Sequence, residues 1–276
     1  MDAALAAVFL APGLALGSFL NVVAARVPMR RSIVRPASAC MSCGTRVAAR
    51  DNIPVVSYLL LRGRCRACGA RIAWYDNVPV VSYLVLHGRC RSCGARIGWQ
   101  YPAVELATAV LLAGCVWRFG LTLDAVLAGF FCAVLVAISA TDLEHRIVPN
   151  RIVVPAALIV LVAQTLLHPS VEWTAGALGA SLFLFVAAVA YPAGMGMGDV
   201  KLALLLGAML GRYSAVALMV GMVAALAPSI YLLARHGAKA RKMGIPFAPF
   251  LALGAVAALF AGHYILEHYL TLFRQS

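Results

Sequence analysis

The sequence predicts an all-α polytopic membrane protein with about eight transmembrane helices and a small cysteine-rich domain between the first two. Of the 276 residues, 63% are hydrophobic and only 12% are charged. A soluble domain carries about 45–50% apolar and about 25% charged residues, so a soluble fold of this length is excluded. The apolar residues also form separate runs near the ~20 residues that a helix needs to cross a bilayer.

These runs define the predicted membrane spans in order along the chain. They cover roughly 3–25, 102–118, 121–141, 151–167, 174–192, 200–211, 213–233 and 247–266. The sixth is short and Gly-rich, so it is either a half-helix or part of one segment with the seventh, which would leave seven spans. The first lacks a basic leading region and a small-residue cleavage site, so we expect it to be retained.

The distribution of Lys and Arg predicts the orientation of the spans. Thirteen Arg residues lie in 26–100, which places this segment in the cytoplasm by the positive-inside rule. With eight spans, twenty of the 23 basic residues fall on that side, and both termini face the periplasm. The net charge of +13 is therefore a topology signal and requires no nucleic-acid partner; its natural partner is the lipid bilayer.

The segment between the first two spans contains a tandem repeat of 25 residues. Residues 40–64 and 65–89 are identical at 16 positions, and a third, partial copy begins at residue 90. Each copy opens with a Cys-x-x-Cys-Gly knuckle, which gives three pairs: Cys40 and Cys43, Cys65 and Cys68, Cys90 and Cys93.

Two such knuckles fit a tetrahedral zinc site built from four thiolates. The cytoplasm is reducing, which disfavours disulfides and leaves a redox or unmetallated role as the alternative. The three pairs supply six thiols and one zinc ion takes four, so spacing leaves open which pair is spare.

Two aspartates lie at predicted span ends on the cytoplasmic side. Asp142 closes the third span, and Asp199 opens the sixth after a Gly-Met-Gly-Met-Gly run. An ionisable group at a membrane segment is costly and points to function. Two carboxylates that share one proton can divide the work of an aspartyl protease: one activates water, and the other donates a hydrogen bond to the scissile carbonyl.

Residues around the two aspartates are accessory candidates. Gly196 and Gly198 allow the backbone to approach a helix or an extended peptide closely. Lys201 either offsets the charge of a nearby carboxylate or anchors the helix by reaching toward the interface.

Several motifs, in order along nearly the whole chain, resemble the prepilin leader peptidase family of Gly-x-Gly-Asp aspartyl proteases. They are Gly17–Val23 with Arg26 and Pro28, the DN-x-P-V-x-SYL segments, the Gly-Arg-Cys knuckle, Tyr101–Glu105, Asp142–Glu144 with Val148-Pro149, and Gly196–Lys201. The resemblance implies Asp142 and Asp199 as the protease pair, with Glu144 as an accessory acid.

The resemblance also implies an inner-membrane enzyme with two activities. One cleaves a prepilin or pseudopilin N-terminal segment after the Gly that ends a short basic leader. The other methylates the new N-terminal amine with S-adenosylmethionine. Its domain scheme is a first transmembrane helix (1–25), a cysteine-repeat domain linked to methylation (26–101) and a transmembrane protease domain (102–276).

The chain departs from the family pattern at two places. The family usually has two knuckles; by position, Cys40, Cys43, Cys90 and Cys93 are the family-like zinc ligands and Cys65 and Cys68 the extra pair, although neighbouring knuckles pair equally well on spacing. Asn150 stands where the family often has Asp, and we expect little consequence.

No Gly-rich donor motif of the soluble type is present, so the methyl-donor site has only two weak candidates. Glu105 would meet a cationic sulfonium or the substrate amine, or else is an interfacial carboxylate; Asn21 is equally a helix-packing group. Three rival functions stay open: a peptidase without methyltransferase activity, a transporter with a carboxylate proton relay, and a zinc-bearing membrane adaptor without catalysis.

Overall fold

The computed structural model describes residues 3–33, 62, 64, 80–89, 96, 98–191, 195–237 and 245–274. The regular elements among these residues are helices; none of them forms a strand, and an isolated bridge pairs Arg89 with Arg96. The all-α prediction is therefore confirmed for the described part of the chain. The fold divides into two compact units, residues 1–120 and 121–276.

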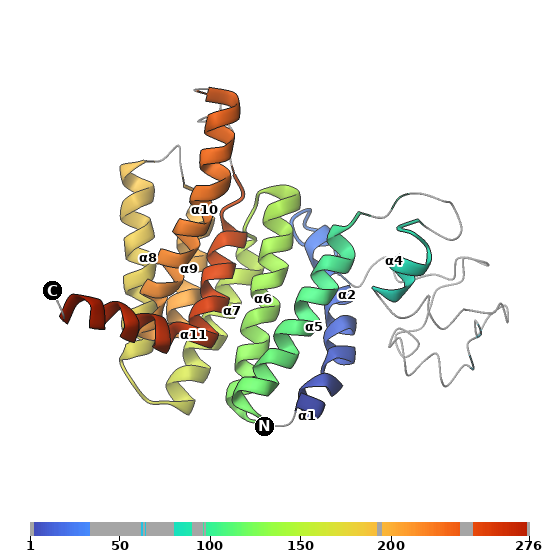
Figure 1. The fold of residues 1–276 in the computed structure, drawn as a ribbon, viewed down its shortest axis with the longest axis horizontal. Coiled ribbons are helices and arrows are strands. Elements are labelled where there is room, and N and C mark those ends of the chain that lie inside the picture. The colour runs from blue at the N-terminus through green and yellow to red at the C-terminus, as the bar shows by residue number, and fades with distance from the viewer. Residues whose placement is uncertain are drawn as a thin grey trace. The chain divides into compact units, whose positions relative to one another are not determined.

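The first unit is built on a close pair of helices. Its helices are α1 (Ala3–Val8), α2 (Leu10–Arg26), α4 (Val81–Val85) and α5 (Gln100–Phe119), and α1 and α2 together form the predicted first span (Figure 1). A Cβ added to Gly17 would lie 2.5 Å from the Cα of Glu105, so α2 and α5 touch at backbone level. Small residues allow this close approach between membrane helices. Within this unit α5 packs against α2, and the predicted boundary at residue 101 between the cysteine-repeat and protease domains stays a prediction.

The second unit surrounds the short helix α9. Its elements are α6 (Leu123–His145), α7 (Asn150–Leu167), α8 (Glu172–Ala190), α9 (Met197–Leu210), the 3-10 turn η3 (Gly211–Tyr213), α10 (Ser214–His236) and α11 (Ala248–Arg274). Side chains of α9 such as Leu202, Leu205 and Leu206 are fully buried. On the outside, large apolar residues are exposed, among them Leu158, Leu178 and Leu182.

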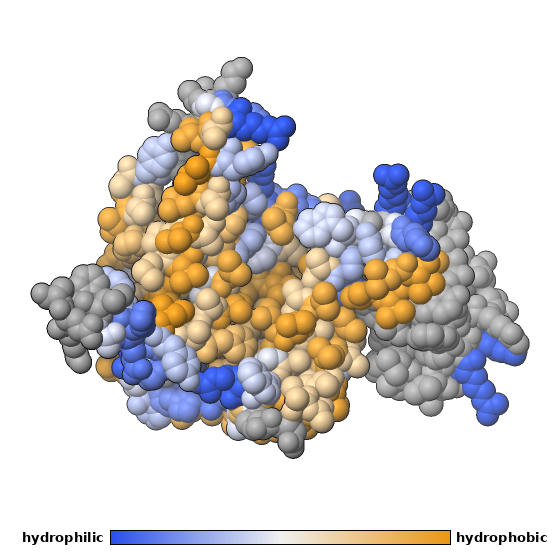
Figure 2. Space-filling view, viewed as in Figure 1, coloured by the Kyte–Doolittle hydropathy of each residue, from blue (hydrophilic) through white to orange (hydrophobic). Residues whose placement is uncertain are grey.

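Those exposed side chains indicate a surface that faces lipid. In Figure 2 hydrophobic residues fill the middle of the visible face of the second unit, and hydrophilic residues gather toward its ends. A bilayer presents the same sequence of environments, hydrocarbon between two polar layers.

Seven helical stretches in the described residues are long and apolar enough to cross a membrane. They match the predicted spans with one difference: the predicted sixth and seventh form a single 40-residue stretch, Met197–His236. Within this stretch α9 and α10 are nevertheless distinct helices separated by η3. The count is seven by length and composition because α9, at 14 residues, is too short to qualify alone.

The chain reverses its direction at η3. Close contacts of Gly207 with Gly176 and of Gly211 with Glu172 show that α9 runs antiparallel to α8. The contacts of Gly221 with Leu251 and of Gly262 with Tyr213 show that α10 runs antiparallel to α11. Since α11 passes from Ala248 to the level of η3, α10 leads back from η3 toward the beginning of α11. Gly211 makes the reversal with a φ of +54°, a conformation that glycine adopts readily.

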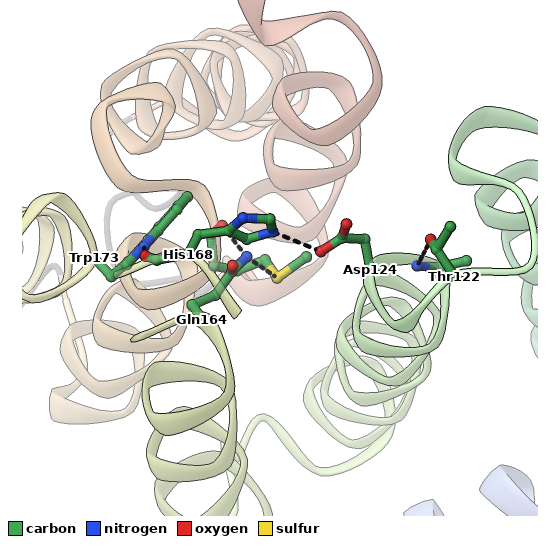
Figure 3. A network of polar contacts seen from close by, with 7 residues as sticks. Thr122, Asp124, Gln164, His168 and Trp173 are labelled. Carbon is green, nitrogen blue, oxygen red and sulfur yellow. Dashed lines mark hydrogen bonds and ion pairs between the residues drawn. The ribbon is translucent and has the colours of Figure 1, made fainter. Parts of the chain in front are cut away.

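Polar side chains join three helices at one end of this unit. His168 Nε2 lies 2.8 Å from Asp124 Oδ1, and Trp173 Nε1 donates to the carbonyl of His168 at 2.7 Å (Figure 3). Thr122 caps α6 beside them by accepting a hydrogen bond from Ala125 N–H. This network fixes the beginnings of α6 and α8 to the end of α7, and Asp142 lies near the other end of α6.

Candidate active site

Asp142 sits in the last turn of α6 and is buried, with only 6% of its surface exposed. Its Oδ2 accepts a hydrogen bond of 3.0 Å from the backbone N–H of Ala248, at the beginning of α11. The free N–H groups of a helix N-terminus stabilise a carboxylate through hydrogen bonding and the helix dipole. Arg146, the left-handed cap that ends α6, adds a positive charge close by.

Asp199 lies in the first turn of α9 and is 9% exposed. Its Oδ2 accepts a hydrogen bond of 3.3 Å from the backbone N–H of Gly196, the N-cap residue. This is the N3 half of a capping box, in which an acidic side chain reaches back to the helix start. One carboxylate oxygen is thereby fixed by the chain's own backbone.

The structure brings the two predicted aspartates together. The negative charge of Asp142 acts on Asp199, although the residues come from α6 and α9. Both lie at helix ends rather than in mid-helix: Asp142 is three residues before the end of α6, and Asp199 is the third residue of α9. The result is a buried pair of acids at the end of the second unit remote from Asp124 and His168.

Gly198 holds the start of α9 against the loop between α6 and α7. A Cβ on Gly198 would lie 2.8 Å from Cβ of Val148, closer than real Cβ atoms approach one another. Gly196 has only an ordinary contact, with Asp199 Oδ2 at 3.7 Å from such a Cβ. The requirement for glycine is therefore steric at Gly198, because the segment 146–149 leaves no room there.

The chain's relationship to known proteins agrees with these motifs. The model of the bacterial peptidase A24 N-terminal domain matches residues 12–75 and 65–119, and that of the type IV leader peptidase family matches residues 129–233. A prepilin leader peptidase/N-methyltransferase of Bacillus subtilis (strain 168) is 33% identical over 270 residues, which cover 94% of this chain and 96% of that relative.

This chain belongs to the type IV leader peptidase family. Proteins with the same name from Burkholderia pseudomallei (strain 1026b) and Pseudomonas aeruginosa (PAO1) are 36% and 35% identical. The alignments cover 91% and 94% of this chain, and 83% and 91% of those relatives. No solved structure matches. The two matches of the N-terminal family model overlap at residues 65–75, where the second copy of the cysteine repeat begins.

The remaining accessory candidates in the second unit have contacts other than the acid pair. The Glu144 side chain is exposed, and its Oε1 lies 3.9 Å from His145 Nε2. Lys201 donates a hydrogen bond of 2.9 Å to Asn150 Oδ1, and this contact is exposed. Lys201 therefore joins α9 to the beginning of α7 and forms no ion pair with a carboxylate among the described residues.

The first unit contains a separate buried acid. Glu105 is 8% exposed, and its Oε2 accepts a hydrogen bond of 2.9 Å from the backbone N–H of Val80. Ser18 on α2 also hydrogen-bonds to this carboxylate. Asn21, one turn further along α2, donates to the carbonyl of Tyr101 at 3.1 Å. Glu105 thus links α2, α5 and the segment leading into α4, while Asn21 is a packing group between α2 and α5.

Ala248 is the part of the acid site that the sequence analysis missed. The Pro246 and Pro249 around it are a helix-start signal, since Pro is favoured in the first helical turn. That signal predicts free N–H groups at this point but not the carboxylate that they face. The positive charge of Arg146, which also acts on Asp142, comes from the residue that ends α6.

The six knuckle cysteines lie outside the described residues, so the zinc prediction is untested by the fold. In the ranges that the structure covers, no cluster of three or more His, Cys, Asp or Glu side chains could hold a metal ion. Cys115 and Cys132 are buried in α5 and α6, as expected of packing residues.

Proposed function

We propose that this chain cleaves the leader from type IV prepilin-like proteins and methylates the N-terminal amine that cleavage creates. Membership of the type IV leader peptidase family and the names of its full-length relatives support both activities. The observation that carries the proteolytic half is the pair of buried carboxylates, Asp142 and Asp199, joined from two helices at one end of the second unit.

In the proposed hydrolysis the two aspartates share the proton transfers. One carboxylate takes a proton from water as the oxygen attacks the scissile carbonyl, and the other, protonated, donates to the carbonyl oxygen. Collapse of the tetrahedral intermediate breaks the C–N bond, and the leaving nitrogen takes up a proton. Backbone N–H groups of Ala248 and Phe247 hold the carboxylate of Asp142, and that of Gly196 holds the carboxylate of Asp199. Both acids are thereby fixed in position for water and substrate.

The orientation follows from the basic residues. The positive-inside rule places the end of the unit that carries Asp142 and Asp199 at the cytoplasmic face of the inner membrane. A prepilin or pseudopilin keeps its basic leader on that side while its apolar helix lies in the bilayer. The acid pair is then at the depth where leader and helix meet.

Methylation requires a second site, which we assign to the first unit. S-adenosylmethionine supplies a methyl group that is attacked by the neutral N-terminal amine. Glu105 is the candidate residue for this site, since a buried carboxylate beside Ser18 can bind a cation or accept the proton that the amine releases. Residues 26–101 would carry a structural zinc on Cys40, Cys43, Cys90 and Cys93, and this domain would serve methylation, while residues 102–276 serve proteolysis.

The test is cleavage of a prepilin N-terminal peptide by the purified full-length protein in lipid. Asp142→Asn and Asp199→Asn keep the shape and the hydrogen-bond acceptor of each side chain but remove the carboxylate. Asp124→Asn is the matched control, because Asp124 lies at the opposite end of α6. We expect kcat/KM to fall by about 10²–10⁴-fold in the two site variants, the usual contribution of acid–base catalysis, and to stay unchanged in the control.

Labelled methyl donor in the same reaction tests the second activity. Cleavage without methylation would identify a peptidase alone and overturn the assignment to the first unit. Full cleavage by either site variant would overturn the aspartyl pair and direct attention to Glu144. The location of both acids at helix ends already disfavours a proton relay across the membrane, which needs acids at mid-depth.

A further inference from the structure

A cavity of about 480 Å³ lies between α8 and α10 in the second unit, with η3 at one end. On α8 it is lined by residues three or four positions apart, from Glu172 through Gly176 and Gly179 to Phe183, so it follows one face of the helix. On α10 the lining includes Leu218, Met219 and Met222. Its volume is within the range of about 300–1,000 Å³ typical of ligand sites.

Gly179 keeps the middle of this cavity open. A Cβ built on Gly179 would meet no atom within 4 Å. At Gly176 and Gly207, in contrast, a Cβ would overlap backbone atoms of the neighbouring helix, so only glycine fits there. The space beside Gly179 is therefore not needed for helix packing. Mobile, polarisable methionine side chains across from it suit a flexible apolar ligand.

The end of the cavity at η3 carries one positive and one negative side chain. Glu172 Oε1 accepts a hydrogen bond of 3.1 Å from the backbone N–H of Arg212 and lies 3.7 Å from Arg212 Nε. The Arg212 side chain is 65% exposed and that of Glu172 is 35% exposed. Both contacts fall on Oε1 of Glu172, which leaves its other oxygen for a ligand. Arg212 Nη2 also donates to the Tyr213 hydroxyl at 3.3 Å, and the guanidinium lies 5.1 Å from the centre of that ring, so a ligand reaches it from its exposed side.

The shape and the lining exclude the substrate helix as the natural occupant. A helix about 10 Å across would find room for only about 6 Å of its length in this volume. No residue of α9 lines the cavity, and its charged end lies at η3, at the opposite end of α9 from Asp199. A single extended hydrocarbon chain fits a cavity of this volume that follows one face of α8.

We infer that this cavity binds one phospholipid with a zwitterionic phosphate–ammonium headgroup. One acyl chain lies along Gly179 between α8 and α10, the phosphate meets Arg212, and the ammonium meets Glu172. The adjacent opposite charges at the mouth select this headgroup over one with phosphate alone. The site is independent of the proposed hydrolysis, because neither aspartate of the pair contributes to it.

Native mass spectrometry of the full-length protein, loaded with phosphatidylethanolamine or phosphatidylglycerol and then stripped of detergent, tests this inference. We expect wild type to retain one phosphatidylethanolamine and to lose phosphatidylglycerol more readily. Gly179→Leu fills the channel and should lose the bound lipid, whereas Leu178→Phe, on an exposed neighbour outside the lining, should retain it. Glu172→Gln should abolish the preference between the two lipids.

Equal retention of both lipids by wild type would overturn the headgroup assignment, and this comparison needs no variant to fold. Retention of phosphatidylethanolamine by Gly179→Leu, with a thermal midpoint like that of wild type, would overturn the location. Displacement of the lipid by an equimolar prepilin peptide would identify the cavity as a substrate site and contradict the inference.

Discussion

The carboxylate of Asp142 accepts a hydrogen bond of 3.0 Å from the backbone N–H of Ala248, a residue 106 positions later in the chain. This contact makes the position of one proposed catalytic carboxylate depend on the packing of α11 against α6. Only a change to proline removes a backbone donor, so the contact survives other substitutions at residue 248. The variants below alter other supports of the site.

Gly198→Ala tests the contact between the start of α9 and the α6–α7 loop. The added methyl group would lie 2.8 Å from Cβ of Val148, so Asp199 must shift relative to Asp142. We expect cleavage to fall at least about tenfold, since small displacements of catalytic groups are costly. Val148→Ala does not remove the Cβ, so the rescue variant is Gly198→Ala with Val148→Gly, which should regain most of the lost activity. Equal activity of Gly198→Ala and wild type would show that the loop can yield.

Gly207→Ala and Gly179→Ala are a matched pair of variants. Gly207 lies in the α8–α9 interface, whereas Gly179 lies on α8 beside open space. A Cβ on Gly207 would overlap the backbone carbonyl of Gly176, whereas one on Gly179 meets nothing. Overpacking costs about 1–3 kcal/mol, while Gly→Ala at an unhindered helix position stabilises by about 0.5–1 kcal/mol. Thermal unfolding in detergent should therefore move to lower temperature for Gly207→Ala only. A lower midpoint for Gly179→Ala would contradict the open space beside it.

Lys201→Met tests whether this lysine supports the acid pair. Its amine donates to Asn150 at an exposed position, so it contributes to stability at the level of a surface interaction, about 0–1 kcal/mol. We expect the kcat/KM of Lys201→Met for the prepilin peptide to stay within about threefold of wild type, far above the values of the Asp142 and Asp199 variants. Asn150→Asp should be equally active, because Lys201 then pairs with a carboxylate. A loss as large as that of Asp199→Asn would assign Lys201 to the catalytic machinery.

Glu105→Gln separates the two proposed activities. Glutamine keeps the acceptor for the Val80 N–H but carries no negative charge for a sulfonium or an ammonium group. Methyl transfer, measured with labelled donor on a peptide that is already cleaved, should fall at least about tenfold, as for loss of a charged hydrogen-bond partner. Cleavage by the same preparation serves as the internal control. Unchanged methylation would mean that Glu105 has only a structural role, in which it joins α5 to the segment before α4.

Metal analysis of the purified protein tests the cysteine domain. We expect one zinc ion per chain, retained in a Cys65→Ser, Cys68→Ser variant and lost when Cys40 and Cys43 are replaced by serine. Loss of zinc in both variants would mean that neighbouring knuckles share the metal. If wild type contains no zinc and still methylates normally, the cysteine domain functions without a metal ion and the zinc prediction is wrong.

The position of the acid pair at one end of the helical unit could be predicted from sequence because two local signals sufficed. Hydropathy delimited the spans, and the Lys and Arg count placed Asp142 and Asp199 on one side of them. The structure then added that both are buried and that their charges interact. Neither the contact of Gly198 with Val148 nor that of Ala248 with Asp142 leaves a trace in a hydropathy pattern, since each depends on how distant helices pack.

The reversal of the chain at η3 could be predicted only in part from the sequence. The shortness of α9 and its glycines were visible in the sequence, which left a half-helix and a continuous span as alternatives. Gly211, with its positive φ, and the antiparallel contacts of α9 with α8 decide for two helices in succession. A window of hydropathy cannot make that decision, because Gly211-Arg212-Tyr213 is too brief to interrupt the average.

The length of α9 has a consequence for how the chain crosses the membrane. Fourteen helical residues extend about 21 Å, against a hydrocarbon thickness of about 30 Å. Its two ends cannot both reach the headgroups of a bilayer of ordinary thickness. Because α9 is surrounded by other helices, the remaining depth of about 9 Å is crossed by non-helical chain, which at this depth is buried in protein or lines a water-filled space. Hydrolysis consumes a water molecule, and a short helix that begins two residues before Asp199 provides such a space where that water is used.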